Sequence, residues 1–269
     1  MMPLTNELPT RRLRFVLLFF SSAFIFGGVL LSKTDVNQQW MIAINQSVSG
    51  IDSLWSVLTQ FGEGGVALLL LLVFTRFSRN GTALSLKCFL IGSVLSPSLK
   101  AIFAHARPLS VLDAGLIHTI GYPPTAANSM PSGHSMTAIA AVTLLCLCLP
   151  VGSKFKPVAA LLVVFGSLVA LSRIMVGAHW PSDVLAGGGL GILIVWLAVQ
   201  WEQFQPWSNY LKQSKSQWGL MLCELGLVIY LFRLHAETPA SQLAIDVIAT
   251  LGIAGLMSRL SLLRKKEMP

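Results

Sequence analysis

Runs of about 20 mostly apolar residues recur along this chain, and no other feature constrains its fold as strongly. Each run is long enough to cross a bilayer as a helix. The runs cover residues 13–31, 54–75, 83–104, 134–150, 157–177, 183–201, 218–234 and 243–260. Only 11% of the 269 residues are charged, against about 25% in an ordinary soluble domain. The sequence therefore excludes a soluble enzyme, a disordered segment and a disulfide-rich scaffold, and predicts an all-α polytopic transmembrane helical bundle.

Basic residues gather on one side of the predicted spans. Most of the 19 lysines and arginines fall in five clusters, which successive spans bring to the same membrane face. The clusters are Arg11, Arg12 and Arg14; Arg76, Arg79 and Lys87; Lys154 and Lys156; Lys212 and Lys215; and Arg259, Arg264, Lys265 and Lys266. By the positive-inside rule this face is cytoplasmic, so the net charge of +8 reflects orientation in a membrane and predicts no nucleic-acid partner. The remaining cations lie on the outer side: Lys33, Lys100, Arg107, Arg173 and Arg233.

The chain divides at its one long polar stretch. We predict a six-span core over residues 1–201, a cytoplasmic linker over 202–217 and a two-span hairpin over 218–269. The first apolar run is longer than a signal-peptide core of about 7 to 15 residues, so we expect it to remain as a membrane anchor. Gly187 and Gly191, at G-x-x-x-G spacing, predict close helix packing in the sixth span.

Residues 35–50 have an amphipathic pattern, because Val36, Trp40, Ile44 and Val48 recur four apart between polar neighbours. This pattern favours a helix that lies in the outer membrane interface. A loop packed on the bundle is equally compatible with it, and the sequence leaves that choice open.

Two cations lie at the outer end of the third span. Lys100 and Arg107 are seven residues apart, which would place them on nearly the same helical face, and Pro108 would then end that helix. Two cations that face one point would suit an anion. The alternative is a pair of ordinary snorkelling anchors at the membrane surface.

A short motif opens the fourth span. It consists of Pro131, Ser132, Gly133 and His134. Proline suits the first helical turn, glycine lets the backbone approach a ligand, and free N–H groups at a helix start attract anions. The motif fits a phosphate, although Pro-Ser-Gly also occurs at ordinary loop-to-helix junctions.

A third cluster joins the fifth and sixth spans. Ser172 and Arg173 end the fifth span, and His179 follows in a short outer loop. Asp183 opens the sixth span, where the helix macrodipole favours a carboxylate. A histidine followed by a nearby carboxylate is typical of a nucleophile or base with its orienting partner. An ordinary polar loop histidine is the alternative, and the neighbouring Arg173 and Asp183 make it less favoured.

Together the three motifs resemble the type 2 phosphatidic acid phosphatase and vanadium haloperoxidase superfamily, in its membrane lipid phosphate phosphatase branch. The pattern runs from Lys100 to Asp183 without a departure. The six-span core is similar to the membrane branch of that family. The last two spans lie outside the resemblance.

The resemblance implies a role for each motif residue. In similar enzymes the counterparts of five residues bind the phosphate oxygens: Lys100, Arg107, Ser132, Gly133 and Arg173. His179 would be the nucleophile that forms a phosphohistidine, oriented by Asp183, and His134 the general acid and then the base for water. Spacing alone would allow the two histidines to exchange roles, and the aspartate favours His179 as nucleophile. The clamp of cations and N–H donors needs no metal, so we expect neither a metal nor a cofactor.

Other residues near the motifs carry weaker signals. His105, His118 and His235 match no motif position, and we expect them to be ordinary loop or interface residues. The long outer loop between Arg107 and Pro131 is a candidate headgroup filter. It contains Asp113, His118, Tyr122, Pro123 and Pro124.

The resemblance and the charge pattern predict a metal-independent lipid phosphatase of the inner (plasma) membrane, with its active site on the periplasmic or extracellular face. Its partner would be a lipid phosphate or diphosphate in the bilayer. Candidates are undecaprenyl diphosphate, phosphatidylglycerol phosphate, phosphatidic acid and lipid A phosphate, and the resemblance alone favours an isoprenoid diphosphate. A lipid phosphotransferase would share the phosphohistidine. The sequence does not predict an oligomeric state.

Two acids inside the last two spans point to a different class of protein. Glu224 and Asp246 lie in apolar runs, where an ionisable residue favours a functional site. They are compatible with a non-catalytic lipid transporter. A buried protonated pair that joins the hairpin explains them equally well, and a transporter leaves the outer cations unexplained.

Overall fold

The computed structural model describes residues 7–47, 50–121, 126–211 and 213–267. Throughout these ranges the regular structure is helical, which confirms the predicted fold class. Several sequence predictions concern residues outside these ranges: Val48, Tyr122, Pro123, Pro124 and Lys212. The side chains of Arg264, Lys265 and Lys266 are likewise outside the described part.

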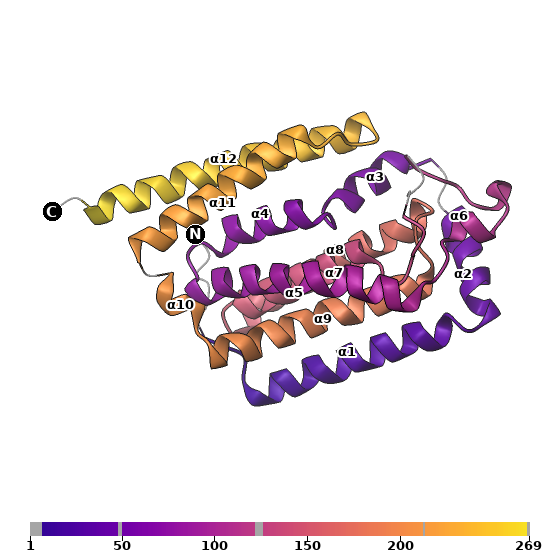
Figure 1. Cartoon of the computed structure of the whole chain (residues 1–269), viewed down its shortest axis with the longest axis horizontal. Helices are drawn as coiled ribbons and strands as arrows, with labels where there is room; N and C mark the ends of the chain where they lie inside the picture. Colours follow the sequence, from indigo (N-terminus) through magenta and orange to yellow (C-terminus); the bar gives the residue numbers. More distant parts are fainter. Residues whose placement is uncertain (1–6, 48–49, 122–125, 212, 268–269) are drawn as a thin grey trace.

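The core is built around one buried helix, α9 (Pro181–Phe204). It packs against α1 (Arg11–Leu31), α5 (Arg79–Phe103), α7 (Gly133–Cys148) and α8 (Lys156–Met175). These helices run roughly side by side along the bundle (Figure 1). The long helices α5, α7, α8 and α9 alternate in direction, so the ends that carry the basic clusters and the ends that carry the three motifs lie at opposite ends of the bundle.

In the part of the chain that the structure describes, five helices are long and apolar enough to span a membrane: α1, α5, α8 with the preceding turn η2 (Ser153–Phe155), α9 and α12 (Pro239–Glu267). The second predicted span is not a single helix. It is broken into α3 (Asp52–Gln60) and α4 (Gly64–Thr75), which meet at an angle of 66°. Glu63 explains the restart, because its carboxylate accepts a hydrogen bond from Val66 N at 2.8 Å and caps α4. The apolar helix α7 has only 16 residues.

The helix of the third span ends within one residue of the predicted span end at 104, and so before Arg107. Helix α5 stops at Phe103, Ala104 adopts a left-handed conformation (φ 45°), and Ala106 pairs as an isolated bridge with Asn128. Arg107 is therefore extended and precedes the short helix α6 (Pro108–Val111). The prediction that Lys100 and Arg107 share one face of a helix that Pro108 ends is wrong. The left-handed residue ends the helix before Arg107 is reached.

Residues Asp35–Gln46 form the helix α2, which packs against α8 and α9. Met41 is fully buried, whereas Trp40 is half exposed. The buried amide of Asn45 donates to the backbone carbonyl of Ile174 at 2.9 Å. The helical interpretation of this segment is thereby confirmed, and the helix is tied to the bundle by polar contacts.

The polar stretch after the core is shorter than the predicted linker over 202–217. Helix α9 continues to Phe204, the short helix α10 covers Trp207–Tyr210, and α11 (Ser214–Arg233) begins soon afterwards. The Glu202 carboxylate accepts a hydrogen bond from Trp207 N at 3.1 Å, so it caps α10. It also pairs with the fully buried Lys87 at 2.6 Å.

Helices α11 and α12 form the predicted C-terminal hairpin, which packs on α3 and α4 (Figure 1). The Glu224 carboxylate of α11 is paired with Arg259 of α12, and both side chains are buried. Asp246 instead accepts a hydrogen bond from Gln242 in its own helix at 3.0 Å. The interpretation of Glu224 and Asp246 as one protonated pair is therefore wrong, because an arginine supplies the partner of Glu224.

Candidate active site

The three motifs, far apart in sequence, meet at one end of the bundle, the right-hand end in Figure 1. Lys100 lies in the last turn of α5, and Arg173 lies in the last turn of α8. Ser132 is the N-cap of α7. Asp183 lies in the first turn of α9, and His179 lies in the loop before it. Four helix ends and the loops between them therefore build the site.

Asp183 is the centre of a buried hydrogen-bond network. Its Oδ2 accepts hydrogen bonds from Trp180 N at 2.9 Å and from Ser129 Oγ, and lies 3.3 Å from His179 Nδ1. Its Oδ1 lies 3.1 Å from His105 Nδ1. Because the carboxylate is fully buried, these donors replace the water that it lost. The expected contact between Asp183 and His179 is present, and it holds the imidazole ring at its Nδ1 atom.

His179 is almost completely buried, with 2% of its surface exposed. Burial lowers its pKa from 6.5 to about 4; the hydrogen bond and charge of Asp183 oppose this shift, and the charges of Arg173 and Arg107 add to it. The ring is therefore neutral at pH 7. Its Nε2 atom lies 3.5 Å from the Arg107 guanidinium, on the side away from Asp183.

Arg107 is held by backbone carbonyls from two loops. Its Nε donates to Ala126 O, and its terminal nitrogen donates to Ala178 O at 2.8 Å. Burial lowers the pKa of Arg107, and the Asp183 charge opposes that shift. The guanidinium of an arginine is always protonated in proteins, so Arg107 stays charged. Although Arg107 does not lie on α5, the loops carry it to the expected place.

The other two cations complete a positively charged cluster. Lys100 and Arg173 are half-buried, and the charges of Lys100, Arg107 and Arg173 lie close enough to act on one another. Arg173 donates a hydrogen bond to the hydroxyl of Thr59. Within the described residues, none of these three cations forms an ion pair with a carboxylate. The arrangement favours an anion between them.

The start of α7 borders this cluster. Ser132 N donates to the Asp183 carbonyl at 3.0 Å, and Ser132 Oγ accepts a hydrogen bond from Ser135 Oγ at 2.9 Å. Helix α9 approaches closely here, because a Cβ atom at Gly187 would lie 2.5 Å from Ser132 O. A Cβ atom at Gly191 would meet the α7 backbone at the same distance. The predicted role of these glycines in close helix packing is confirmed.

Sequence reasoning missed three residues that contact the site. His105 was expected to be an ordinary loop residue, yet it contacts Asp183, as does Ser129. Thr59 contacts Arg173 from the broken second span. His105 and Ser129 lie two residues before Arg107 and Pro131, respectively, so proximity to a motif was an available signal. Nothing in the sequence around Thr59 indicates its contact.

The remaining histidines lie away from this network. His118 is exposed and pairs with Asp52 at 2.9 Å, and His235 is exposed in the loop between α11 and α12. Their surroundings are those of ordinary loop residues. Of the outer loop that was predicted to filter headgroups, the structure describes the residues up to Gly121 and from Ala126 onward.

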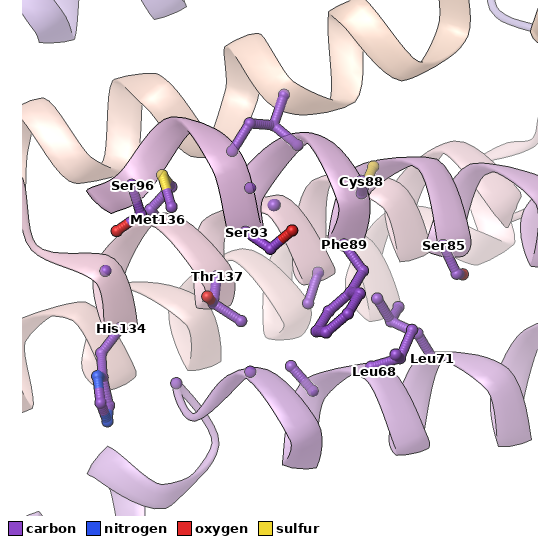
Figure 2. A pocket seen from close by; sticks show the side chains of 18 residues that line it. Leu68, Leu71, Ser85, Cys88, Phe89, Ser93, Ser96, His134, Met136 and Thr137 are labelled. Carbon is purple, nitrogen blue, oxygen red and sulfur yellow. The ribbon is translucent and has the colours of Figure 1, made fainter. Parts of the chain in front are cut away.

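A cavity of about 310 Å³ extends from the site between α4, α5 and α7. Figure 2 shows the His134 ring at one end of it, with Phe89, Leu68 and Leu71 farther along. The lining is mostly apolar. Its hydroxyl-bearing side chains are those of Ser85, Ser93, Ser96 and Thr137. A cavity with one polar end and apolar walls suits an amphipathic ligand.

Comparisons with known proteins agree with this arrangement. The chain matches the family model of the PAP2 superfamily over residues 81–207. It is 32% identical over 185 residues to an undecaprenyl-diphosphatase of Sulfolobus acidocaldarius, an alignment that covers 68% of this chain and 85% of the relative. It is 30% identical over 173 residues to the phosphatidylglycerophosphatase B of Bacillus subtilis, covering 60% of this chain and 75% of that protein.

The fold is also shared with a solved structure. The crystal structure of a transmembrane PAP2 type phosphatidylglycerolphosphate phosphatase from Bacillus subtilis superposes with a TM-score of 0.53 at 24% sequence identity. The superposition covers 98% of that chain and 70% of this one. The superposition shows a shared fold, and the family model and the 32% identical relative confirm the family resemblance predicted from the three motifs.

Proposed function

We propose that this chain, which belongs to the PAP2 superfamily, is an integral membrane lipid phosphatase that acts at the outer face through a phosphohistidine intermediate. The observation that carries the proposal is a cluster of three cations close to His179 and His134, with His134 also lining a largely apolar cavity. The cations would hold a phosphate while the cavity holds the lipid chain.

The phosphate clamp follows from charge and hydrogen bonding. A phosphate group carries about −1.5 to −2 charge at neutral pH, and Lys100, Arg107 and Arg173 offset it. Ser132 adds its own O–H group, because the hydrogen bond from Ser135 uses only a lone pair of the Ser132 oxygen. The backbone N–H of Gly133 at the start of α7 adds a further donor. These groups also stabilise the charge that spreads over the equatorial oxygens during transfer.

His179 is the nucleophile in this mechanism. With Nδ1 donating its proton to Asp183, the lone pair of Nε2 is available beside Arg107. Nε2 attacks phosphorus, the bond from phosphorus to the leaving oxygen breaks, and His134 donates a proton to that oxygen. His134 then removes a proton from water, which attacks the phosphohistidine and releases inorganic phosphate. The neutral state of His179 supports this assignment.

A long-chain lipid is the proposed substrate class. The cavity runs from His134 along α4, α5 and α7, so a tail in it would hold the headgroup at the clamp. An isoprenoid diphosphate is our first choice, and the undecaprenyl-diphosphatase relative supports it. Phosphatidylglycerol phosphate is the second, supported by the phosphatidylglycerophosphatase B relative.

The decisive experiment is phosphate release by purified protein from mixed micelles of detergent and lipid phosphates with different headgroups. We expect release from a long-chain substrate at a far higher kcat/KM than from a water-soluble phosphate ester with the same headgroup. Equal kcat/KM on the long-chain substrate and on the water-soluble ester would refute the proposal that the substrate is a lipid. Transfer of phosphate to a second lipid, with none released from the donor lipid alone, would identify a phosphotransferase instead.

The outer location of the site is tested by cysteine labelling. In a background without the four native cysteines, Ala127→Cys lies at the site end and Ser153→Cys at the opposite end, and both positions are exposed. We expect an impermeant thiol reagent to label only Ala127→Cys in intact cells, because the basic clusters lie at the Ser153 end. The reverse labelling pattern would move the reaction to the cytoplasm.

A further inference from the structure

The break between α3 and α4 lies directly against the site. A Cβ atom at Gly62 would lie 2.7 Å from His134 Cβ and 3.0 Å from His134 O, so the backbone of the break packs on His134. Thr59, in the last turn of α3, is buried and contacts Arg173. Both contacts come from a segment outside the residues that match the family model. The break therefore contacts two charged or titratable groups of the site at once.

The contact with Thr59 fixes the orientation of Arg173. One terminal nitrogen of the guanidinium donates to the Thr59 hydroxyl, while Arg173 Nε is buried and has no hydrogen-bond partner among the described residues. A guanidinium binds a phosphate best when an edge that carries two N–H groups points at the oxygens. Because Thr59 holds one terminal nitrogen, rotation of the guanidinium is restricted.

The C-terminal hairpin holds the break in place. Tyr230 of α11 donates its O–H to Glu63 Oε1 at 3.2 Å, and the other oxygen of Glu63 caps α4. The Tyr230 ring packs on the α4 backbone, since a Cβ atom at Gly65 would lie 2.7 Å from its Cε1. At the other end of the hairpin loop, Thr238 Oγ1 lies 2.9 Å from Ser56 Oγ of α3. The hairpin thus contacts both arms of the broken span.

We propose that Thr59 is a positioning residue for Arg173, and that the hairpin fixes the α3–α4 break which carries Thr59. The proposal rests on the proposed function, in which Arg173 binds the phosphate. Helix α3 has 9 residues and α4 has 12, so neither can span the bilayer alone. External contacts must therefore set the angle between them. The hairpin supplies such contacts through Tyr230 and Thr238.

The first test compares Thr59→Val with Thr59→Ser. We expect Thr59→Val to lower kcat/KM at least tenfold and to reduce the thermal stabilisation of the protein by vanadate, which mimics the transferring phosphoryl group. Thr59→Ser keeps the hydroxyl, so its kcat/KM and its stabilisation by vanadate should both stay within about twofold of the wild-type values. Thr59→Ala provides a second variant that lacks the hydroxyl if Thr59→Val does not fold. The control is Thr250→Val, whose exposed hydroxyl bonds only to its own helix.

The second test concerns the hairpin. The double variant Tyr230→Phe and Thr238→Val removes both polar contacts with the broken span, and we expect kcat/KM to fall about threefold or more. Tyr210→Phe, at an exposed position of the linker, should leave it unchanged. Wild-type activity in the double variant would refute the bracing role.

Vanadate separates failure of this proposal from failure of the proposed function. Undiminished vanadate stabilisation in Thr59→Val and in Thr59→Ala would refute the positioning role of Thr59. A wild-type protein that binds vanadate and yet releases no phosphate from any lipid would refute the lipid phosphatase function, while the vanadate comparison would still test Thr59.

Discussion

The two ends of the helical bundle use their buried charges in opposite ways. At the basic end, two buried cations of the described part each meet a carboxylate: Lys87 pairs with Glu202, and Arg259 pairs with Glu224. At the other end, three cations gather, and none of them forms an ion pair with a carboxylate of the described residues; Asp183 nearby binds histidines and backbone instead. A paired charge holds helices together, whereas a group of cations without carboxylate partners is suited to bind an anion.

Lys87 illustrates the structural use of charge. Its ammonium is fully buried, donates to Gln205 O at 2.7 Å, and lies 5.1 Å and 5.0 Å from the ring centres of Trp201 and Trp207. The sequence placed Lys87 only in a basic cluster on the predicted cytoplasmic face. In the structure, the contacts of its ammonium group connect α5 to the end of α9. The following predictions test this contrast between the two ends.

The largest expected effect is at His179. His179→Ala should lower kcat for phosphate release by several orders of magnitude, because it removes the atom that forms the covalent intermediate. Vanadate-induced stabilisation should persist in part, since the cations remain. The matched control is His118→Ala, which removes an exposed histidine paired with Asp52 and should leave kcat unchanged. Substantial turnover in His179→Ala would remove His179 from the mechanism.

The next largest effect should follow loss of one cation from the clamp. Arg107→Ala should lower kcat/KM by about 10² to 10³, the range seen when one donor that stabilises the transition state is removed. Arg233→Ala, which removes an exposed arginine near the same end of the bundle, is the control and should be close to wild type. Similar losses in both variants would mean that net charge, and not the clamp, matters.

At the basic end the same kind of change should act on stability. Lys87→Met leaves the buried Glu202 without its cation, and breaking a buried ion pair costs about 3 to 5 kcal/mol. We expect a lower midpoint of unfolding with little change in KM for the protein that remains folded. The double variant Lys87→Met with Glu202→Gln should recover part of the loss. A change in KM without a change in stability would contradict the structural role.

Low pH should lower the stability of the fold through protonation of His179. Its folded-state pKa of about 4 lies below the usual 6.5, so below pH 6.5 the unfolded chain binds the proton more readily. The contribution to stability is therefore complete above pH 6.5 and is lost as the pH falls toward 4, by about 2 kcal/mol at pH 5. His179→Gln should show a smaller loss of stability between pH 7 and pH 5 than wild type. An identical loss in both proteins would contradict the lowered pKa.

The smallest expected effect is that of a chelator. If the three cations of the site neutralise the phosphate, activity should be unchanged in excess EDTA and should be inhibited by vanadate. Loss of activity that magnesium restores would mean that the cation cluster is insufficient for phosphate transfer.

The sequence by itself determined the features that depend on local composition. Apolar runs placed the helices within a few residues, because a backbone in a bilayer must satisfy its own hydrogen bonds as a helix. The alternation of runs and basic clusters assigned the motifs to one end of the bundle. The residues of the three motifs were readable because their identities and spacing identify the family without any knowledge of their positions in space.

Only the tertiary structure decided which side chains from distant segments meet. No local pattern predicts that Thr59 would contact Arg173, that His105 would contact Asp183, or that Arg259 would pair with Glu224. The break at Gly62 could not be predicted from the sequence either, because an apolar run has the same pattern whether its helix is straight or bent. The physical reason is that hydrophobicity acts without direction, whereas these contacts depend on the angles and register that helices adopt only when they pack together.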